Sequence, residues 1–140
     1  MELFISDLDG TLLNGNAEVT EFTRDTLNRL MAKGLNFTAA TARTLASAGK
    51  ILSELDLKLP VILMNGVLIY DMAEKKYVKI NSLSRELCGL IIGLSKGIGL
   101  EPFMYSVSDN QLSTRYERLI SPAMKSFYNE RRKKYYKSFT

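Results

Sequence analysis

The 140-residue sequence contains no histidine and no tryptophan, and it has a single cysteine. The absence of histidine excludes nucleophilic triads built on imidazole, imidazole acid–base catalysis and zinc sites with histidine ligands. Cys88 has no second cysteine with which to form an internal disulfide, which is typical of a reducing compartment, so we expect a cytoplasmic protein. Any catalysis must therefore use carboxylates, hydroxyls, lysine or arginine.

Long apolar runs are also missing. No stretch reaches the roughly 20 residues that a membrane-spanning helix needs, and the opening residues do not have the pattern of a signal peptide, so we expect no membrane association. The composition, 46% hydrophobic and 24% charged, is typical of a globular domain.

The net charge of +4 comes from one end of the chain. Residues 115–140 hold eight lysines and arginines against two glutamates, whereas the first 114 residues are slightly acidic. Bases and aromatics alternate in residues 127–137, as they do in proteins that bind single-stranded nucleic acid. A helix with a solvated basic face explains the same pattern, and we expect no nucleic-acid partner.

Strand and helix patterns alternate through the first 64 residues. Residues 2–6 have the pattern of a short buried strand, and residues 35–40 and 61–64 have those of two further strands. Helical spacing of apolar residues fills the intervals, over residues 20–33 and 44–55. This order predicts an α/β fold with a Rossmann-like, doubly wound parallel sheet.

The pattern changes after Gly66. Two hairpins are predicted over residues 67–80 and 101–116, and a final helix begins at Ser121-Pro122. Between the hairpins lies a helix over residues 84–96, whose inward face is predicted to carry Leu87, Leu90, Ile91 and Leu94. We therefore expect an α/β core at residues 1–81, followed by the start of an α+β module at residues 82–140.

Polar residues follow each of the first three strands, as DLDGT at 7–11, TAR at 41–43 and NG at 65–66. The carboxyl ends of parallel strands meet at one edge of a sheet, where ligands bind. Asp7 and Asp9 can face one pocket, and Mg²⁺ would relieve their repulsion and attract phosphate. Gly10 allows a sharp turn whose amides can face an anion. An EF-hand loop is excluded because Leu12 stands where that loop needs glycine.

At these residues the sequence resembles a known family. FISDLDGTLL (residues 4–13) resembles the first signature of the haloacid-dehalogenase-like phosphohydrolases, and FTAATAR (37–43) resembles their second motif. VILMNG followed by VLIYD (61–71) is similar to the Cof-type branch, in which an α/β cap follows the third strand. The resemblance implies a Mg²⁺-dependent phosphomonoester hydrolase that acts on small phosphorylated metabolites, such as sugar phosphates or phosphorylated cofactors.

The same resemblance implies a role for each motif residue. Asp7 is the nucleophile that forms an aspartyl-phosphate, and Asp9 is the general acid and base. Mg²⁺ is held by the Asp7 carboxylate and the Asp9 main-chain carbonyl. The phosphate-binding positions are Leu8, Gly10, Thr41 and Ala42, and the substrate-binding positions are Arg43, Asn65 and Gly66. Ala42 stands where the family usually has glycine.

The family's third motif is a lysine and its fourth an acidic pair, and nothing after Asp9 in this sequence matches them. We therefore expect the N-terminal portion of a phosphatase (a truncated product, a split gene product or a natural fragment) with at most trace activity alone. A phosphomutase of the same fold and a non-catalytic fragment for binding or assembly remain open. Without the returning half of the core, residues 2–6 would be a sheet edge with Leu3 and Ile5 uncovered, so we expect self-association.

Overall fold

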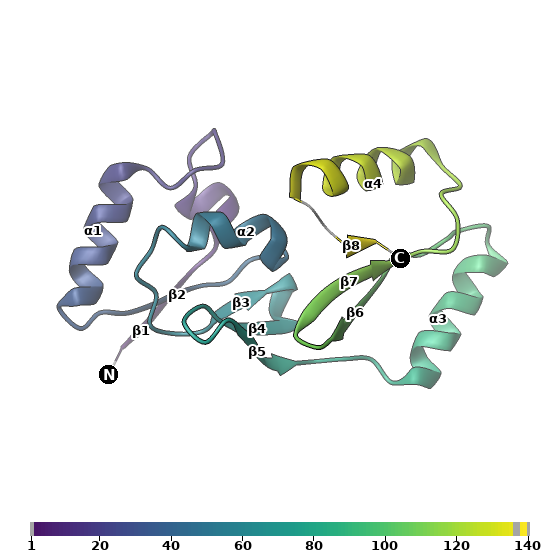
Figure 1. Cartoon of the computed structure of the whole chain (residues 1–140), viewed down its shortest axis with the longest axis horizontal. Helices are drawn as coiled ribbons and strands as arrows, with labels where there is room; N and C mark the ends of the chain where they lie inside the picture. Colours follow the sequence, from purple (N-terminus) through teal and green to yellow (C-terminus); the bar gives the residue numbers. More distant parts are fainter. Residues whose placement is uncertain (1, 136–137, 140) are drawn as a thin grey trace. The chain divides into compact units, whose positions relative to one another are not determined.

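The computed structural model describes residues 2–135 and 138–139, and the chain divides into two compact units, Met1–Asn81 and Ser82–Thr140 (Figure 1). In the N-terminal unit, strands and helices alternate before an antiparallel hairpin. The elements are β1 (Leu3–Ser6), α1 (Glu21–Ala32), β2 (Asn36–Ala39), α2 (Leu45–Leu52), β3 (Val61–Leu63), β4 (Leu68–Asp71) and β5 (Lys76–Ile80).

The strands of this unit are parallel first and antiparallel afterwards. β1 pairs with β2 in parallel, from Leu3 opposite Asn36 to Ser6 opposite Ala39. A parallel bridge between Ala40 and Ile62 joins β2 to β3, and β3, β4 and β5 then pair antiparallel in chain order. The predicted α/β class with a parallel core is confirmed, and the first predicted hairpin forms its antiparallel end.

Local sequence signals determine where the helices begin and end. The amide of Thr23 donates a 3.2 Å hydrogen bond to the hydroxyl of Thr20, which caps α1. After α1 the chain turns at Gly34, whose φ of +99° lies in the left-handed region that favours glycine. Helix α2 ends at Leu52 rather than at the predicted Leu55, although Leu55 is still buried.

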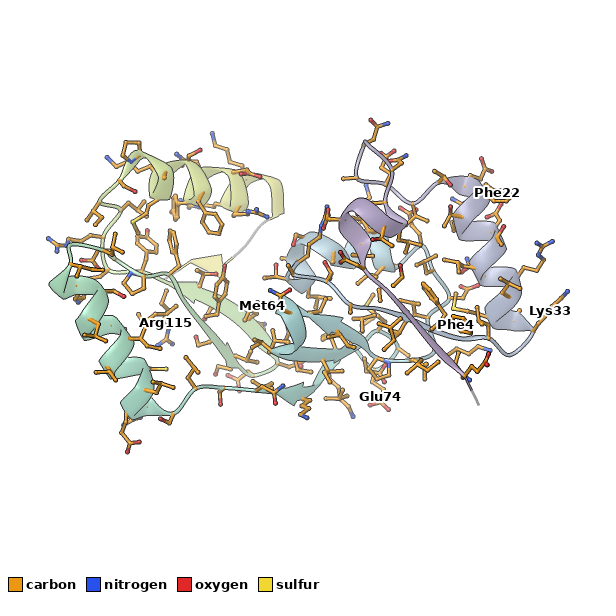
Figure 2. All side chains as sticks on the ribbon, turned by 180° about the vertical axis from the view of Figure 1, so that it is seen from behind. Phe4, Phe22, Lys33, Met64, Glu74 and Arg115 are labelled. Carbon is orange, nitrogen blue, oxygen red and sulfur yellow. The ribbon has the colours of Figure 1, made fainter. Side chains whose placement is uncertain are left out.

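The first strand has the apolar pattern of a buried strand, but it is exposed, as expected of a sheet edge without its second neighbour. Leu3, Phe4 and Ile5 are 55%, 49% and 50% exposed, and Figure 2 labels Phe4 on this strand. Within the described part of the chain, β1 pairs only with β2, so one side of the strand has no neighbour to cover it. The apolar pattern alone indicates burial, but burial also requires a second neighbouring strand, and the expectation that Leu3 and Ile5 are uncovered is confirmed.

The C-terminal unit contains a helix, a hairpin and a second helix. Its elements are α3 (Arg85–Gly97), β6 (Met104–Ser108), β7 (Gln111–Arg115), α4 (Pro122–Tyr135) and β8 (Ser138–Phe139). The hairpin turns at Asp109 and Asn110, whose φ angles of +50° and +59° suit a two-residue turn. The Ser121 hydroxyl accepts a 3.1 Å hydrogen bond from the amide of Met124 at the start of α4, as predicted.

The prediction that one face of α3 is buried is wrong. Leu87, Leu90, Ile91 and Leu94 lie on the helix as expected, but they are 42–64% exposed. Helical spacing predicts which residues share a face, whereas burial depends on a partner surface elsewhere in the chain. Among the side chains that the structure describes, every buried apolar one belongs to the N-terminal unit.

The basic, aromatic segment predicted to be helical belongs to α4 as far as Tyr135, while Tyr136 and Lys137 lie outside the described residues. Aromatic rings link α4 to the hairpin region, since the Phe103 ring centroid lies 5.1 Å from that of Phe127. In the described part of the chain no helix has both the length and the apolar character to cross a membrane.

Candidate active site

Asp7 lies immediately after β1 and opens a tight turn. One of its carboxylate oxygens, Oδ1, accepts a 2.7 Å hydrogen bond from the amide of Leu8. The Leu8 side chain is fully buried and anchors the turn, while Asp7 and Asp9 on either side of it are exposed. Gly10 has φ +75° and ψ 4°, a conformation in which glycine is favoured. The amide of Leu13 closes the turn on the carbonyl of Leu8 at 2.9 Å.

The ends of β2 and β3 are joined by main-chain hydrogen bonds around Thr41. This residue is 5% exposed, and its amide donates to the Ile62 carbonyl at 2.9 Å while its carbonyl accepts from the Asn65 amide at 3.1 Å. The Thr41 hydroxyl accepts a 3.2 Å bond from the amide of Arg43. The Ala40 amide donates to the Ser6 carbonyl at 2.8 Å, so the end of β1 adjoins the same cluster.

The turn after β3 has an unusual backbone. Met64, Asn65 and Gly66 all have positive φ, at +51°, +55° and +90°. The Met64 amide donates to the Arg43 carbonyl at 3.1 Å, and the Gly66 carbonyl accepts a 2.8 Å bond from the Asn81 side chain. These contacts hold Asn65 and Gly66 beside the ends of β2 and β3, where the sequence predicted them.

Arg43 and Asp9 form a two-point ion pair that the sequence did not predict. The guanidinium donates from Nε to Asp9 Oδ2 at 2.8 Å and from Nη2 to Asp9 Oδ1 at 2.5 Å. The hydrogen bonds from Arg43 lower the pKa of the Asp9 carboxyl below its ordinary value, and the positive charge of Arg43 acts in the same direction against partial burial. The sequence signal that could have indicated this pair is an arginine and an aspartate that follow the ends of two neighbouring parallel strands.

Asp9, Thr41, Arg43 and Asn65 are therefore linked by hydrogen bonds at one edge of the sheet. Asp7 lies two residues from Asp9 on the same turn. Ala42 is exposed beside this cluster. Because the Leu8 side chain is buried, only its main chain is available to a ligand.

The donor atoms at this edge fit Mg²⁺ in part. The Asp7 carboxylate and the Asp9 carbonyl are hard oxygen donors, the kind that Mg²⁺ prefers, and this ion commonly keeps several waters. Across the residues that the structure describes, no group of three cysteine or acidic side chains is placed to hold a metal. The chain's own residues thus supply only part of a coordination shell.

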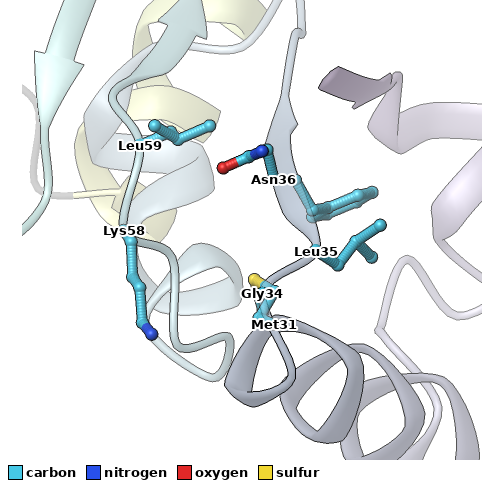
Figure 3. Close-up of a pocket in the computed structure, with 7 residues that line it drawn as sticks. Met31, Gly34, Leu35, Asn36, Lys58 and Leu59 are labelled. Carbon is cyan, nitrogen blue, oxygen red and sulfur yellow. The ribbon is translucent and has the colours of Figure 1, made fainter. Parts of the chain in front are cut away.

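A small cavity of about 70 Å³ lies at the opposite edge of the sheet (Figure 3). It lies between the start of β2, at Asn36 and Phe37, and the segment before β3, at Lys58 and Leu59. The cavity lies at the amino ends of the parallel strands, whereas the Asp7–Asp9 turn follows the carboxyl end of β1. The cavity therefore takes no part in the arrangement described above.

The fold and site define an α/β protein with two aspartates at the carboxyl end of its first parallel strand. Residues 4–140 match the model of the haloacid dehalogenase-like hydrolases, so the chain belongs to that family. The predicted family and its Cof-type branch are confirmed.

Three similar proteins illustrate the match. A protein of Buchnera aphidicola named "Putative phosphatase" is 41% identical over 70 residues, covering 50% of this chain and 26% of the relative. A protein of Mycoplasma genitalium, also named a putative phosphatase, is 37% identical over 94 residues, covering 66% of this chain and 34% of the relative. A crystal structure from Thermotoga maritima shares the fold with a TM-score of 0.70 at 24% identity, covering 99% of this chain and 48% of that one. The chain spans about a quarter to a third of the two curated relatives' length.

Proposed function

We propose that the protein acts as a Mg²⁺-dependent phosphomonoester hydrolase on small phosphorylated metabolites, in the cytoplasm, through an aspartyl-phosphate. The observation that carries this proposal is the placement of Asp7 and Asp9 on one exposed turn, on either side of the buried Leu8. Family membership supports it, since relatives of this chain are named as phosphatases.

In the first step an Asp7 carboxylate oxygen attacks phosphorus, and the bond between phosphorus and the ester oxygen breaks. Asp9 gives a proton to the departing oxygen. In the second step water attacks phosphorus, Asp9 takes the proton of that water, and the bond to Asp7 breaks to release phosphate. The ion pair with Arg43 favours the ionised form of Asp9, which suits the second step and opposes the protonated form that the first step needs.

The remaining site residues would hold the substrate. Phosphoryl oxygens would be bound by Thr41 and by main-chain groups at Leu8, Gly10 and Ala42. Asn65 and Gly66 would lie nearer the rest of the substrate. Mg²⁺ would be held by the Asp7 carboxylate and the Asp9 carbonyl, and when bound it supplies charge neutralisation for phosphoryl transfer. The C-terminal unit would be part of the cap that selects the substrate.

Labelling with [³²P]acetyl phosphate in the presence of Mg²⁺ tests the proposal on this chain. Acetate is a good leaving group that needs no proton, so a nucleophile alone suffices to become phosphorylated. We expect a hydroxylamine-sensitive label in the unmodified chain and in Asp9→Asn, and none in Asp7→Asn. In Asp9→Asn the label should persist longer because water activation is lost.

Asp56→Asn is the matched control, because Asp56 is an exposed carboxylate of the same unit outside the site. It should be labelled like the unmodified chain. Equal labelling of Asp7→Asn would refute Asp7 as the nucleophile, and absence of any label would favour a non-catalytic binding role.

A further inference from the structure

Arg43 holds Asp9 from a part of the chain that is itself fixed. Its amide donates to the Thr41 hydroxyl at 3.2 Å, and its carbonyl accepts from the Met64 amide at 3.1 Å, so its main chain is bound at both ends. Its side chain is 18% exposed, whereas that of Asp9 is 55% exposed. The better-anchored partner of this pair is the arginine.

We propose that Arg43 is a positioning residue for Asp9: its guanidinium fixes the Asp9 carboxylate for proton transfer and acts through Asp9 instead of binding the substrate. This inference rests on the proposed function. It replaces the substrate-binding role that the family resemblance implies for Arg43.

The geometry of the guanidinium supports this role. Nε and Nη2, two donors on one edge of the planar group, are both occupied by the two Asp9 oxygens. The third nitrogen, Nη1, lies 3.5 Å from the Ser47 carbonyl of α2. The guanidinium therefore links the turn after β1 to the first turns of α2, and a substrate would have to break the pair to use its Nε edge.

Asp9 needs such a partner because its own turn does not fix its side chain. Its backbone is extended within the turn, at φ −73° and ψ 123°, and more than half of its side chain is exposed. A proton-transfer group works only within hydrogen-bond reach of the reacting oxygen. Exposed ion pairs contribute little to stability, so the expected benefit is orientation.

Arg43→Lys separates charge from geometry, because lysine keeps the positive charge but cannot reproduce the two-point contact. Acetyl phosphate phosphorylates Asp7 without help from Asp9, whereas decay of the phosphoenzyme needs Asp9 to take a proton from water. We therefore expect Arg43→Lys to form phosphoenzyme at a rate within about twofold of the unmodified chain and to lose it about tenfold more slowly. In Asp9→Asn, adding Arg43→Lys should slow decay no further.

Arg24→Lys is the matched control, since Arg24 also pairs with an aspartate, Asp25, at 3.0 Å but lies on α1 outside the site. Its formation and decay rates should be unchanged. Slower formation with normal decay in Arg43→Lys would overturn the proposal, because it would place Arg43 on the phosphoryl group. Multiplicative slowing in the double variant would overturn it as well.

An NMR measurement separates failure of this inference from failure of the proposed function. The ¹H–¹⁵N signal of Arg43 Nε should shift in Asp9→Asn and stay in place in Asp7→Asn. An unchanged signal in Asp9→Asn would show that the pair is absent and would overturn the inference whatever the activity. A shifted signal in a chain that takes no label at Asp7 would refute the proposed function, and with it a catalytic purpose for the pair.

Discussion

At the residue scale, the chemistry of the site depends on how two side chains from different strands meet. Asp9 and Arg43 are 34 positions apart in sequence, and each could be predicted as a site residue from its own motif. Their pairing could not be predicted, because it depends on the rotamer that each side chain adopts after the strands have paired. The structure shows that the Arg43 guanidinium pairs with the Asp9 carboxylate.

The ion pair predicts a change in acid stability. The pKa of Asp9 is lowered by the hydrogen bonds from Arg43, so this group stabilises the fold above its unfolded pKa of about 4 and loses that effect as pH falls through the lower folded value. Arg43→Gln should therefore reduce the loss of unfolding free energy between pH 7 and pH 2. The expected difference is that of an exposed pair, about 0.2–1 kcal/mol.

Urea unfolding in metal-free buffer at several pH values measures this effect. Arg43→Gln and Asp9→Asn should show the same weakened pH dependence, since each removes the pair. If the unfolding free energy of Arg43→Gln falls with decreasing pH as steeply as that of the unmodified chain, the assigned cause of the pKa shift is contradicted.

At the scale of elements, the turn after β1 depends on one glycine. Gly10 has φ +75°, and a Cβ added there would meet nothing within 4 Å, so the cost of a side chain is purely conformational. We expect Gly10→Ala to destabilise the chain by about 1 kcal/mol.

Gly15→Ala provides the comparison for this prediction. A Cβ at Gly15 also meets nothing within 4 Å, but its φ lies outside the left-handed region. This variant should be neutral or slightly stabilising in urea unfolding. Equal losses of stability in the two variants would contradict the conformational explanation.

The sequence predicted elements better than it predicted their burial. Strand–helix alternation, the second hairpin and the final helix that begins at Ser121-Pro122 come from local signals, and the structure contains all of them. The exposure of the apolar face of α3 depends on which other segments cover it, which no local pattern contains. The exposure of β1 was expected only because the resemblance indicated which neighbouring strand is missing. The same limit explains why the site's strand ends were predicted but its ion pair was not.

The two units should therefore differ in local stability. The buried apolar side chains that the structure describes lie in the N-terminal unit, among them Ala39, Leu52 and Leu63. We expect amides of β2 and β3 to exchange with solvent most slowly and amides of α3 to exchange much faster. Hydrogen exchange followed by mass spectrometry checks this, and equal protection of α3 and β2 would contradict it.

At the scale of the whole molecule, the outer edge of β1 is an exposed edge of the sheet that carries the site. Its residues Leu3, Phe4 and Ile5 are apolar and about half exposed, and the strand carries no charge that would oppose pairing. Such an edge is a template for another strand. We propose that isolated chains associate through this edge.

Light scattering at micromolar concentration should give a mass above the 15.8 kDa of one chain. Ile5→Lys should restore the monomer by placing a charge on the edge, whereas Leu94→Lys, at an exposed leucine of α3, should leave the association intact. A monodisperse monomer of the unmodified chain would refute this proposal, and rescue by Leu94→Lys alone would assign the interface to α3.

The central claim, that the strand-end turn carries a phosphoryl-accepting nucleophile, is tested most directly by locating the phosphorylated residue. Treating the phosphorylated chain with borohydride reduces an acyl phosphate to an alcohol and so marks the residue that held the phosphoryl group. Peptide mass spectrometry should find this mark at Asp7 and not at Asp9. A mark at Asp9 or at any other carboxylate, or its absence from a chain that turns over phosphate esters, would contradict the account.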